Sequence, residues 1–138
     1  MKVLIIAILL VLPMAIFGQK ALEPKTPKEK AEALLNSIQK GDISGGYDQL
    51  FVDSCPGLDK AQQVLYLKKQ TDTGLFLYGK VLGHEFVKEE TSGSSVMRLV
   101  YLLKSEDYFT VWNFYFYKPK ERWLTAGVFF NSELSTLN

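Results

Sequence analysis

His84 is the only histidine in the chain and the side chain best suited to acid–base chemistry. Its reference pKa of about 6.5 would let it work as a general base near neutral pH. A general base also needs a carboxylate that orients its ring, and the adjacent Glu85 would point to the opposite face of a strand. His84 is therefore the catalytic candidate, while a structural histidine bonded to water or to the backbone is the favoured interpretation.

Cys55 is the only cysteine, so the chain cannot form an intramolecular disulfide bond. As a nucleophile, its thiol would need a nearby base or cation that lowers its pKa from about 8.5. The flanking residues, Ser54 and Pro56-Gly57, are typical of a loop. We interpret Cys55 as a small apolar residue that packs within this loop.

Aromatic side chains are the candidates for binding a small apolar ligand. Tyr78, Tyr101, Trp112 and Tyr115 could line a pocket with their rings and hydroxyl groups. The competing interpretation is packing within a sheet, with the hydroxyl groups at its rim. Aromatic groups serve both purposes, so the sequence leaves the two interpretations open.

The sequence carries no motif for a metal ion or a cofactor. One histidine and one cysteine cannot complete a zinc site, and the acidic residues lack the spacing of a calcium-binding loop. Gly45, Gly46 and Gly93 belong to turns without a phosphate-binding pattern. The formal net charge of +1 gives no basic excess for nucleic acid or an anionic membrane surface. We therefore expect no cofactor and no nucleic-acid partner.

The aromatic candidates depend on residues 109–117, whose aromatic and β-branched side chains favour a strand. Alternation would place one set on one face, Trp112, Phe114 and Phe116, and another set on the opposite face, Val111, Asn113, Tyr115 and Tyr117. Both faces would then carry large apolar side chains. The chain's own helices can cover one face, and the other needs a ligand, a partner or a second copy.

Helices are predicted before this strand. Thr26, Pro27 and Glu29 form a capping box with proline in the first turn, and Gly41 ends the first helix. Residues 42–46 are predicted to form a turn that leads into a short second helix. A third helix is expected from about residue 60 to Thr71, with Ala61, Val64, Leu65 and Leu67 as its apolar positions, and Gly74 is expected to mark its end.

From Leu75 onward the apolar period changes from about four residues to two, which indicates strands. Strands are predicted over residues 79–90, 95–104, 109–117 and 122–130. Helices followed by consecutive strands imply an α+β fold, in which three helices pack on a curved four-stranded antiparallel sheet. The helix residues expected to meet one sheet face are Leu35, Ile38, Leu50, Val64 and Leu67.

The order and spacing of several short segments resemble the nuclear transport factor 2-like superfamily. These segments are Lys40-Gly41-Asp42, residues 47–50, Leu82-Gly83 and residues 122–127. Within that group the chain is similar to small exported bacterial domains of unknown function. The resemblance implies a cystatin-like cone whose interior can hold an apolar ligand or substrate, and an outer sheet face that often forms a homodimer. Enzymes of the superfamily place Asp, His, Arg or Tyr inside the cone, and this chain offers no matching set.

Residues 1–18 are typical of an export signal, because Lys2 precedes an apolar run that ends at the small residue Gly18. Pro13 interrupts this run, which is shorter than the roughly 20 apolar residues of a transmembrane helix. Cleavage after Gly18 would leave a linker, residues 19–25, and a single domain, residues 26–138. We therefore expect a periplasmic or secreted protein with no stable membrane anchor after processing.

The favoured function is a non-catalytic exported domain that binds a small apolar ligand or a protein partner. The alternative is a cone-type isomerase, dehydratase or hydrolase that uses His84 with a tyrosine. An acidic side chain within hydrogen-bond reach of His84 would favour this alternative. For the sheet face without helices we expect a homodimer. The competing expectations are that tyrosine hydroxyl groups, Asn113 and the stems of Lys or Arg side chains make this face tolerable in water, or that residues 131–138 fold over it.

Overall fold

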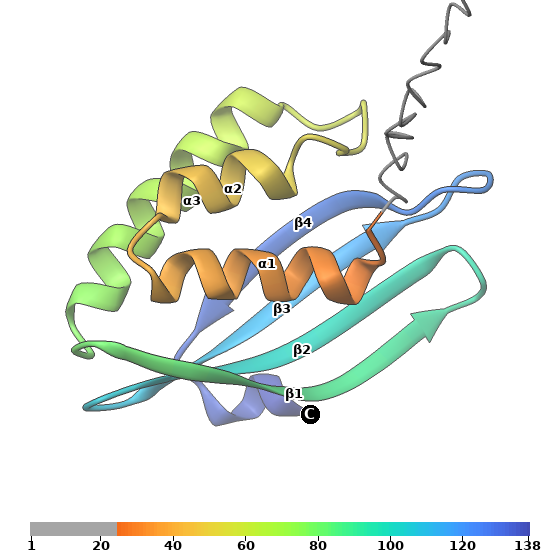
Figure 1. Cartoon of the computed structure of the whole chain (residues 1–138). Coiled ribbons are helices and arrows are strands. Elements are labelled where there is room, and N and C mark those ends of the chain that lie inside the picture. Colours follow the sequence, from red (N-terminus) through yellow and green to blue (C-terminus); the bar gives the residue numbers. More distant parts are fainter. Residues whose placement is uncertain (1–24) are drawn as a thin grey trace, which may run out of the picture.

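The computed structural model describes residues 25–138, which form α-helices followed by a four-stranded antiparallel sheet (Figure 1). The elements are α1 (Pro27–Gln39), α2 (Ile43–Leu50), α3 (Lys60–Phe76), β1 (Val81–Ser92), β2 (Val96–Ser105), β3 (Phe109–Tyr117), β4 (Leu124–Asn131) and the 3₁₀ helix η1 (Leu134–Leu137). Neighbouring strands pair in the order β1-β2-β3-β4, so the predicted α+β meander is confirmed. The predicted export signal, residues 1–18, lies outside the described residues. Across residues 25–138 no helix has both the length and the apolar content needed to cross a membrane.

The start of α1 follows the predicted capping pattern. The Thr26 hydroxyl accepts a hydrogen bond from the Glu29 amide at 3.2 Å, and Pro27 occupies the first helical position. This bond satisfies one of the amide groups that the first turn of a helix leaves without a partner. The predicted beginning of α1 is therefore confirmed.

Residues 42–46 do not form the predicted turn, because α2 already begins at Ile43. The Asp42 carboxylate caps this helix by accepting a hydrogen bond from the Gly45 amide at 3.0 Å. Gly46 lies within the helix, where a Cβ atom would approach the Ser37 Cβ atom to 2.8 Å. The glycine therefore permits close packing of α1 and α2, and the prediction of a turn was wrong.

The end of α3 was also predicted too early, since the helix continues beyond Thr71 to Phe76. Thr71 is fully buried, and its hydroxyl shares a 2.6 Å hydrogen bond with the hydroxyl of Tyr47. Gly74 does not end the helix, because it serves close packing: a Cβ atom there would lie 3.3 Å from the Phe130 ring. Tertiary packing therefore overrides a local signal that usually marks a helix end.

The inner face of the sheet, which the α-helices cover, forms the hydrophobic core (Figure 1). Trp112, Phe114 and Phe116 point to this face and are fully buried. The Trp112 ring stacks on Phe130 with 4.3 Å between centroids. The core also contains all five helix residues that were expected to meet the sheet, Leu35, Ile38, Leu50, Val64 and Leu67. The predicted inner packing is therefore confirmed.

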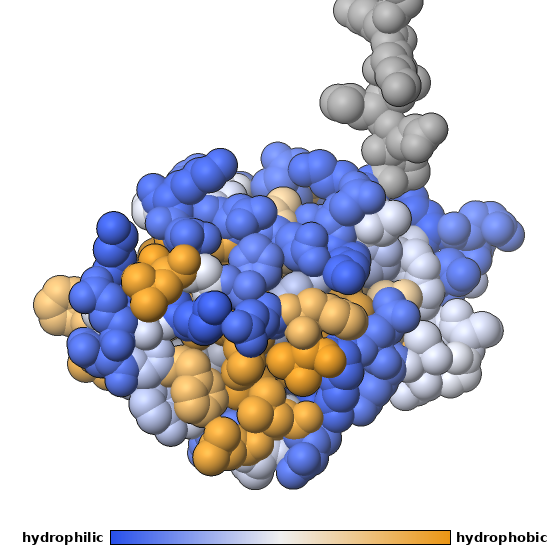
Figure 2. Space-filling view, turned by 60° about the horizontal axis from the view of Figure 1, so that its bottom comes forward, coloured by the Kyte–Doolittle hydropathy of each residue, from blue (hydrophilic) through white to orange (hydrophobic). Residues whose placement is uncertain are grey.

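The outer face of the sheet lies opposite the helices and is partly covered by η1, which contacts β3. Val111 and Asn113 at the centre of this face are buried, whereas Tyr117 and Phe129 near its margin are exposed. Figure 2 views the molecule with the lower side of Figure 1 turned toward the reader. Apolar residues gather in the middle and lower part of this view, below a largely hydrophilic band. The C-terminal segment thus folds over part of the outer face, which is one of the expectations for this face.

Candidate functional site

His84 lies on β1 and is half-buried, with Leu103 of the core as its pairing partner on β2. Its ring meets the edge of the Tyr101 ring, with 5.9 Å between centroids. Among residues 25–138, its side chain makes no hydrogen bond or ion pair with a carboxylate. The geometry therefore does not supply the orienting partner that general-base catalysis requires.

The Glu32 carboxylate on α1 is bound by a tyrosine of the sheet. The Tyr101 hydroxyl donates a hydrogen bond to the Glu32 carboxylate at 3.1 Å and so joins β2 to α1. Burial first, and then the negative charge of Glu32, raise the pKa of Tyr101 above its usual value. Tyr101 therefore remains a protonated donor in a structural contact.

The four aromatic residues predicted to bind a ligand do not share one site. Tyr101 and Trp112 are fully buried on the inner face, while Tyr115 lies on the outer face and stacks on Phe129 at 5.6 Å. Tyr78 lies beyond α3, where its ring is 5.7 Å from that of Tyr108. Trp112 and Tyr115 separate because their positions in β3 have opposite parity. The predicted set of ligand-binding residues is therefore not brought together.

Cys55 is half-buried in the loop between α2 and α3. Its amide donates a hydrogen bond to the Thr125 carbonyl at 2.9 Å, and the Thr125 amide donates to Asp53 at the same distance. These two bonds attach the loop to the beginning of β4. Burial raises the pKa of the Cys55 thiol, which opposes formation of a reactive thiolate. The surroundings fit the structural role that the sequence favoured.

Metal ligands do not cluster in the described part of the chain. Within residues 25–138, no three side chains of the types His, Cys, Asp and Glu come together as a possible metal site.

An apolar groove runs between α2 and α3, and we call it the α2–α3 groove. It has a volume of about 760 Å³ and is lined by Asp48, Val52, Lys60, Ala61, Val64, Leu65 and Lys68. Val52 is 70% exposed and Leu65 is 55% exposed, although the sequence assigned Leu65 to the apolar positions of its helix. An ion pair of 2.7 Å between Lys68 and Asp48 joins the two helices beside it. The groove thus combines exposed apolar side chains with charged ones.

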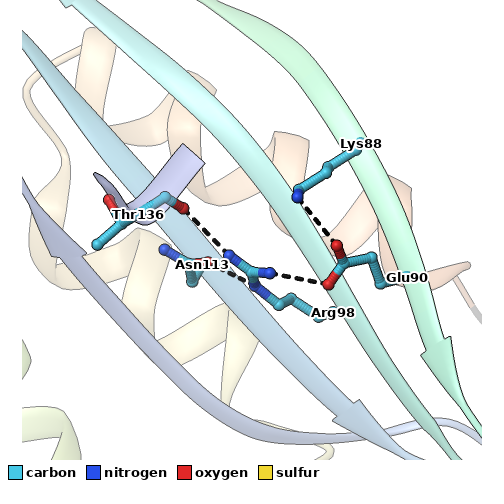
Figure 3. Close-up of polar contacts among 5 residues, drawn as sticks. All are labelled: Lys88, Glu90, Arg98, Asn113 and Thr136. Atoms are coloured by element: carbon cyan, nitrogen blue, oxygen red, sulfur yellow. Dashed lines mark hydrogen bonds and ion pairs between the residues drawn. The ribbon is translucent and has the colours of Figure 1, made fainter. Parts of the chain in front are cut away.

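A polar cluster lies on the outer face of the sheet and is drawn in Figure 3. The Arg98 guanidinium donates to the Asn113 side-chain oxygen at 2.8 Å, to the Glu90 carboxylate at 2.8 Å, and to the Thr136 carbonyl at 3.1 Å. Lys88 pairs with the other oxygen of Glu90 at 2.9 Å. Hydrogen bonds from Lys88 first, and then from Arg98, lower the pKa of the Glu90 carboxyl. Glu90 is therefore held in its ionised form between two cations.

Asn113 is the unusual member of this cluster, because it is only 1% exposed and its amide nitrogen has no hydrogen-bond partner among the described residues. A buried donor without a partner costs about 1–3 kcal/mol of stability. Arg98 and Asn113 were not among the predicted site residues. The available signal was a polar residue at an outward position within each of two strongly apolar strands.

Comparison of the chain with models of protein families, with curated protein sequences and with solved structures finds no match in any of the three.

Proposed function

We propose that this protein is a non-catalytic domain that binds a polypeptide partner through the α2–α3 groove. The observation that carries the proposal is the exposure of Val52 and Leu65 along a groove of about 760 Å³. Exposed apolar side chains that gather on a surface and have a polar rim are typical of protein-binding sites. The groove has both features.

The packing of the inner face favours a polypeptide over a small apolar ligand held in the cone. Leu99, Tyr101, Trp112 and Phe114 have no exposed surface, so no water-sized space adjoins them. Small-molecule sites usually enclose most of their ligand in a concave pocket. The α2–α3 groove is open along one side, which suits a helix or loop of another protein.

Charge at the groove favours a partner with acidic residues. Lys68 is paired with Asp48, but Lys60 at the groove and Lys69 on the same helix form no ion pair within residues 25–138. An amphipathic helix could place its apolar side against Val52 and Leu65 and its acidic side chains near these two lysines. We therefore propose an amphipathic helix with acidic flanks as the bound element.

Site-specific photo-crosslinking in the producing cells tests this proposal. A photoreactive amino acid at Val52 should give a discrete protein adduct, whereas the same group at Glu121, outside the groove, should not. Leu65→Glu should lower the adduct yield about tenfold, since losing one good apolar contact removes on the order of 1.4 kcal/mol. Leu82→Glu is the matched control, because Leu82 lies on β1 and is 56% exposed, compared with 55% for Leu65. Equal yields at Val52 and Glu121, or equal effects of the two substitutions, would contradict the proposal.

We also propose that the domain belongs to the nuclear transport factor 2-like superfamily and is exported. The order of the elements, three α-helices and then an antiparallel meander, supports the first proposal. The apolar run before Gly18 supports the second. Intact-mass measurement of secreted material should give a chain that begins at Gln19, and a cell-associated product that retains residues 1–18 would contradict export.

A further inference from the structure

The outer face of the sheet beneath η1 contains a buried hydrogen-bond donor without an acceptor among the described residues, the Asn113 amide nitrogen. Arg98 lies next to Asn113 and donates to its side-chain oxygen, and the buried Val100 and Val111 also lie beside Asn113. Arg98 reaches the Thr136 carbonyl at 3.1 Å, but the Asn113 amide nitrogen has no partner among the described residues. In Figure 3 this nitrogen points away from Arg98. Thr136 therefore satisfies only one of the two side chains.

The charges of the cluster indicate that an anion would complete it. Lys88 and Arg98 are both paired with the single carboxylate of Glu90, so these three side chains carry one positive charge in excess. A carbonyl offers one oxygen atom and no charge. A carboxylate offers two oxygen atoms, one for Arg98 and one for the Asn113 amide, together with the missing negative charge.

The segment that now covers Asn113 has little buried surface of its own. None of the residues of η1 is buried, and Leu134 is 63% exposed. The hydrogen bond from Arg98 to Thr136 is its polar link to the polar cluster. Such a segment opens at little cost in free energy, as short terminal elements with little buried surface usually do.

We propose that Arg98 and Asn113 form a binding site for a carboxylate, and that η1 covers this site in the present structure. The ligand is an acidic side chain of a polypeptide that replaces η1, because the segment seated there now is itself a polypeptide. Phe129 and Tyr117 on the same face are exposed and would contact the flanking residues of that polypeptide. This site is separate from the α2–α3 groove and does not depend on the function proposed there.

Nuclear magnetic resonance of the full mature chain at neutral pH tests the proposal with acetate as the first probe. Acetate should shift the side-chain amide signals of Asn113 in a saturable manner, whereas acetamide and chloride at equal ionic strength should not. The second probe is a peptide of residues 132–138 that carries Thr136→Glu, with Thr136→Gln as its control. The glutamate peptide should bind at least about tenfold more tightly than acetate. Failure of acetate to shift Asn113 would overturn the site, and equal affinity of acetate and peptide would overturn the assignment of a polypeptide ligand.

Variants separate the site from general electrostatics. Arg98→Gln and Asn113→Leu should each weaken peptide binding at least about tenfold, followed at the Thr136 amide. Lys104→Gln should leave binding unchanged, because Lys104 lies on the same strand as Arg98 but pairs with Glu85 at 3.0 Å and is not part of the polar cluster. Asn113→Leu keeps the branched shape and the number of heavy atoms of the side chain, so it provides the test if Arg98→Gln does not fold. Equal losses for Lys104→Gln and Asn113→Leu would contradict the proposal.

Discussion

The two faces of β3 differ in what covers them. On the inner face, Trp112 and Phe114 are sealed by α-helices and by stacking against neighbouring rings. On the outer face, Asn113 is equally buried but lies beneath a short segment that buries none of its own residues. Alternate residues of β3 therefore have different surroundings on the two faces of the sheet. The inner face is closed by apolar packing, and the outer face keeps a polar group that packing alone does not explain.

The largest expected effect comes from opening the inner face. Phe114→Ala should reduce the free energy of unfolding by about 3–5 kcal/mol, because it removes a fully buried ring and leaves a cavity. Phe129→Ala, on a ring that is 47% exposed, should cost no more than about 1 kcal/mol. Urea unfolding of both variants measures the difference. Similar losses for the two would show that the outer face contributes to the core as strongly as the inner face does.

A smaller effect is expected when a satisfied polar pair in the core is broken. Tyr47→Phe should cost about 1–3 kcal/mol, because it leaves the buried hydroxyl of Thr71 without its 2.6 Å partner. Tyr66→Phe is the control, since Tyr66 is 63% exposed and should change stability by no more than about 0.5 kcal/mol. Thermal unfolding compares the two. A neutral Tyr47→Phe would mean that this hydrogen bond contributes nothing.

The outer face should respond differently to the loss of its buried polar group. Asn113→Leu should change the free energy of unfolding by no more than about 1 kcal/mol in either direction, because removing a buried donor without a partner offsets the loss of the hydrogen bond from Arg98 to the Asn113 oxygen. Urea unfolding is again the measurement. A loss of more than about 2 kcal/mol would show that the Asn113 amide nitrogen also has a stabilising partner, which would remove the contrast with Tyr47.

The smallest effect concerns pH. Lys88 and Arg98 lower the pKa of Glu90 in the folded state, so this carboxylate contributes stability above its unfolded pKa, near 4.5. That contribution is lost as the pH falls through the lower, folded pKa. Glu90→Gln should therefore be less stable than the parent at pH 7, and the difference should shrink in acid. A difference that stays constant down to acidic pH would contradict this role for Glu90.

The sequence predicted the fold well where local patterns and packing agree. Residues 109–117 form a strand with the predicted bounds, and Thr26 begins α1 as expected. The predictions failed at Gly46 and Gly74, where glycine provides room for a neighbouring helix or ring instead of a turn. That use depends on contacts distant in the sequence, so local turn signals cannot detect it.

The site was harder to predict than the fold. Alternation correctly separated Trp112 from Tyr115, but it could not show that the inner set is packed without space for a ligand. The cluster of Arg98, Asn113 and Thr136 depends on the register of β2 with β3 and on the path of the C-terminal segment. Neither follows from the periodicity of one strand.

The most direct test of this account asks whether the inner face admits a ligand. The indole N–H of Trp112 donates a 2.8 Å hydrogen bond to Thr110 inside the core, so its resonance reports on that space. In a titration of the mature chain with laurate, a small apolar ligand, this resonance should not move. The other tryptophan, Trp123, is half-buried and serves as the internal reference. A saturable shift of the Trp112 signal without one at Trp123 would show that the inner face of the sheet holds a ligand and would contradict its closed packing.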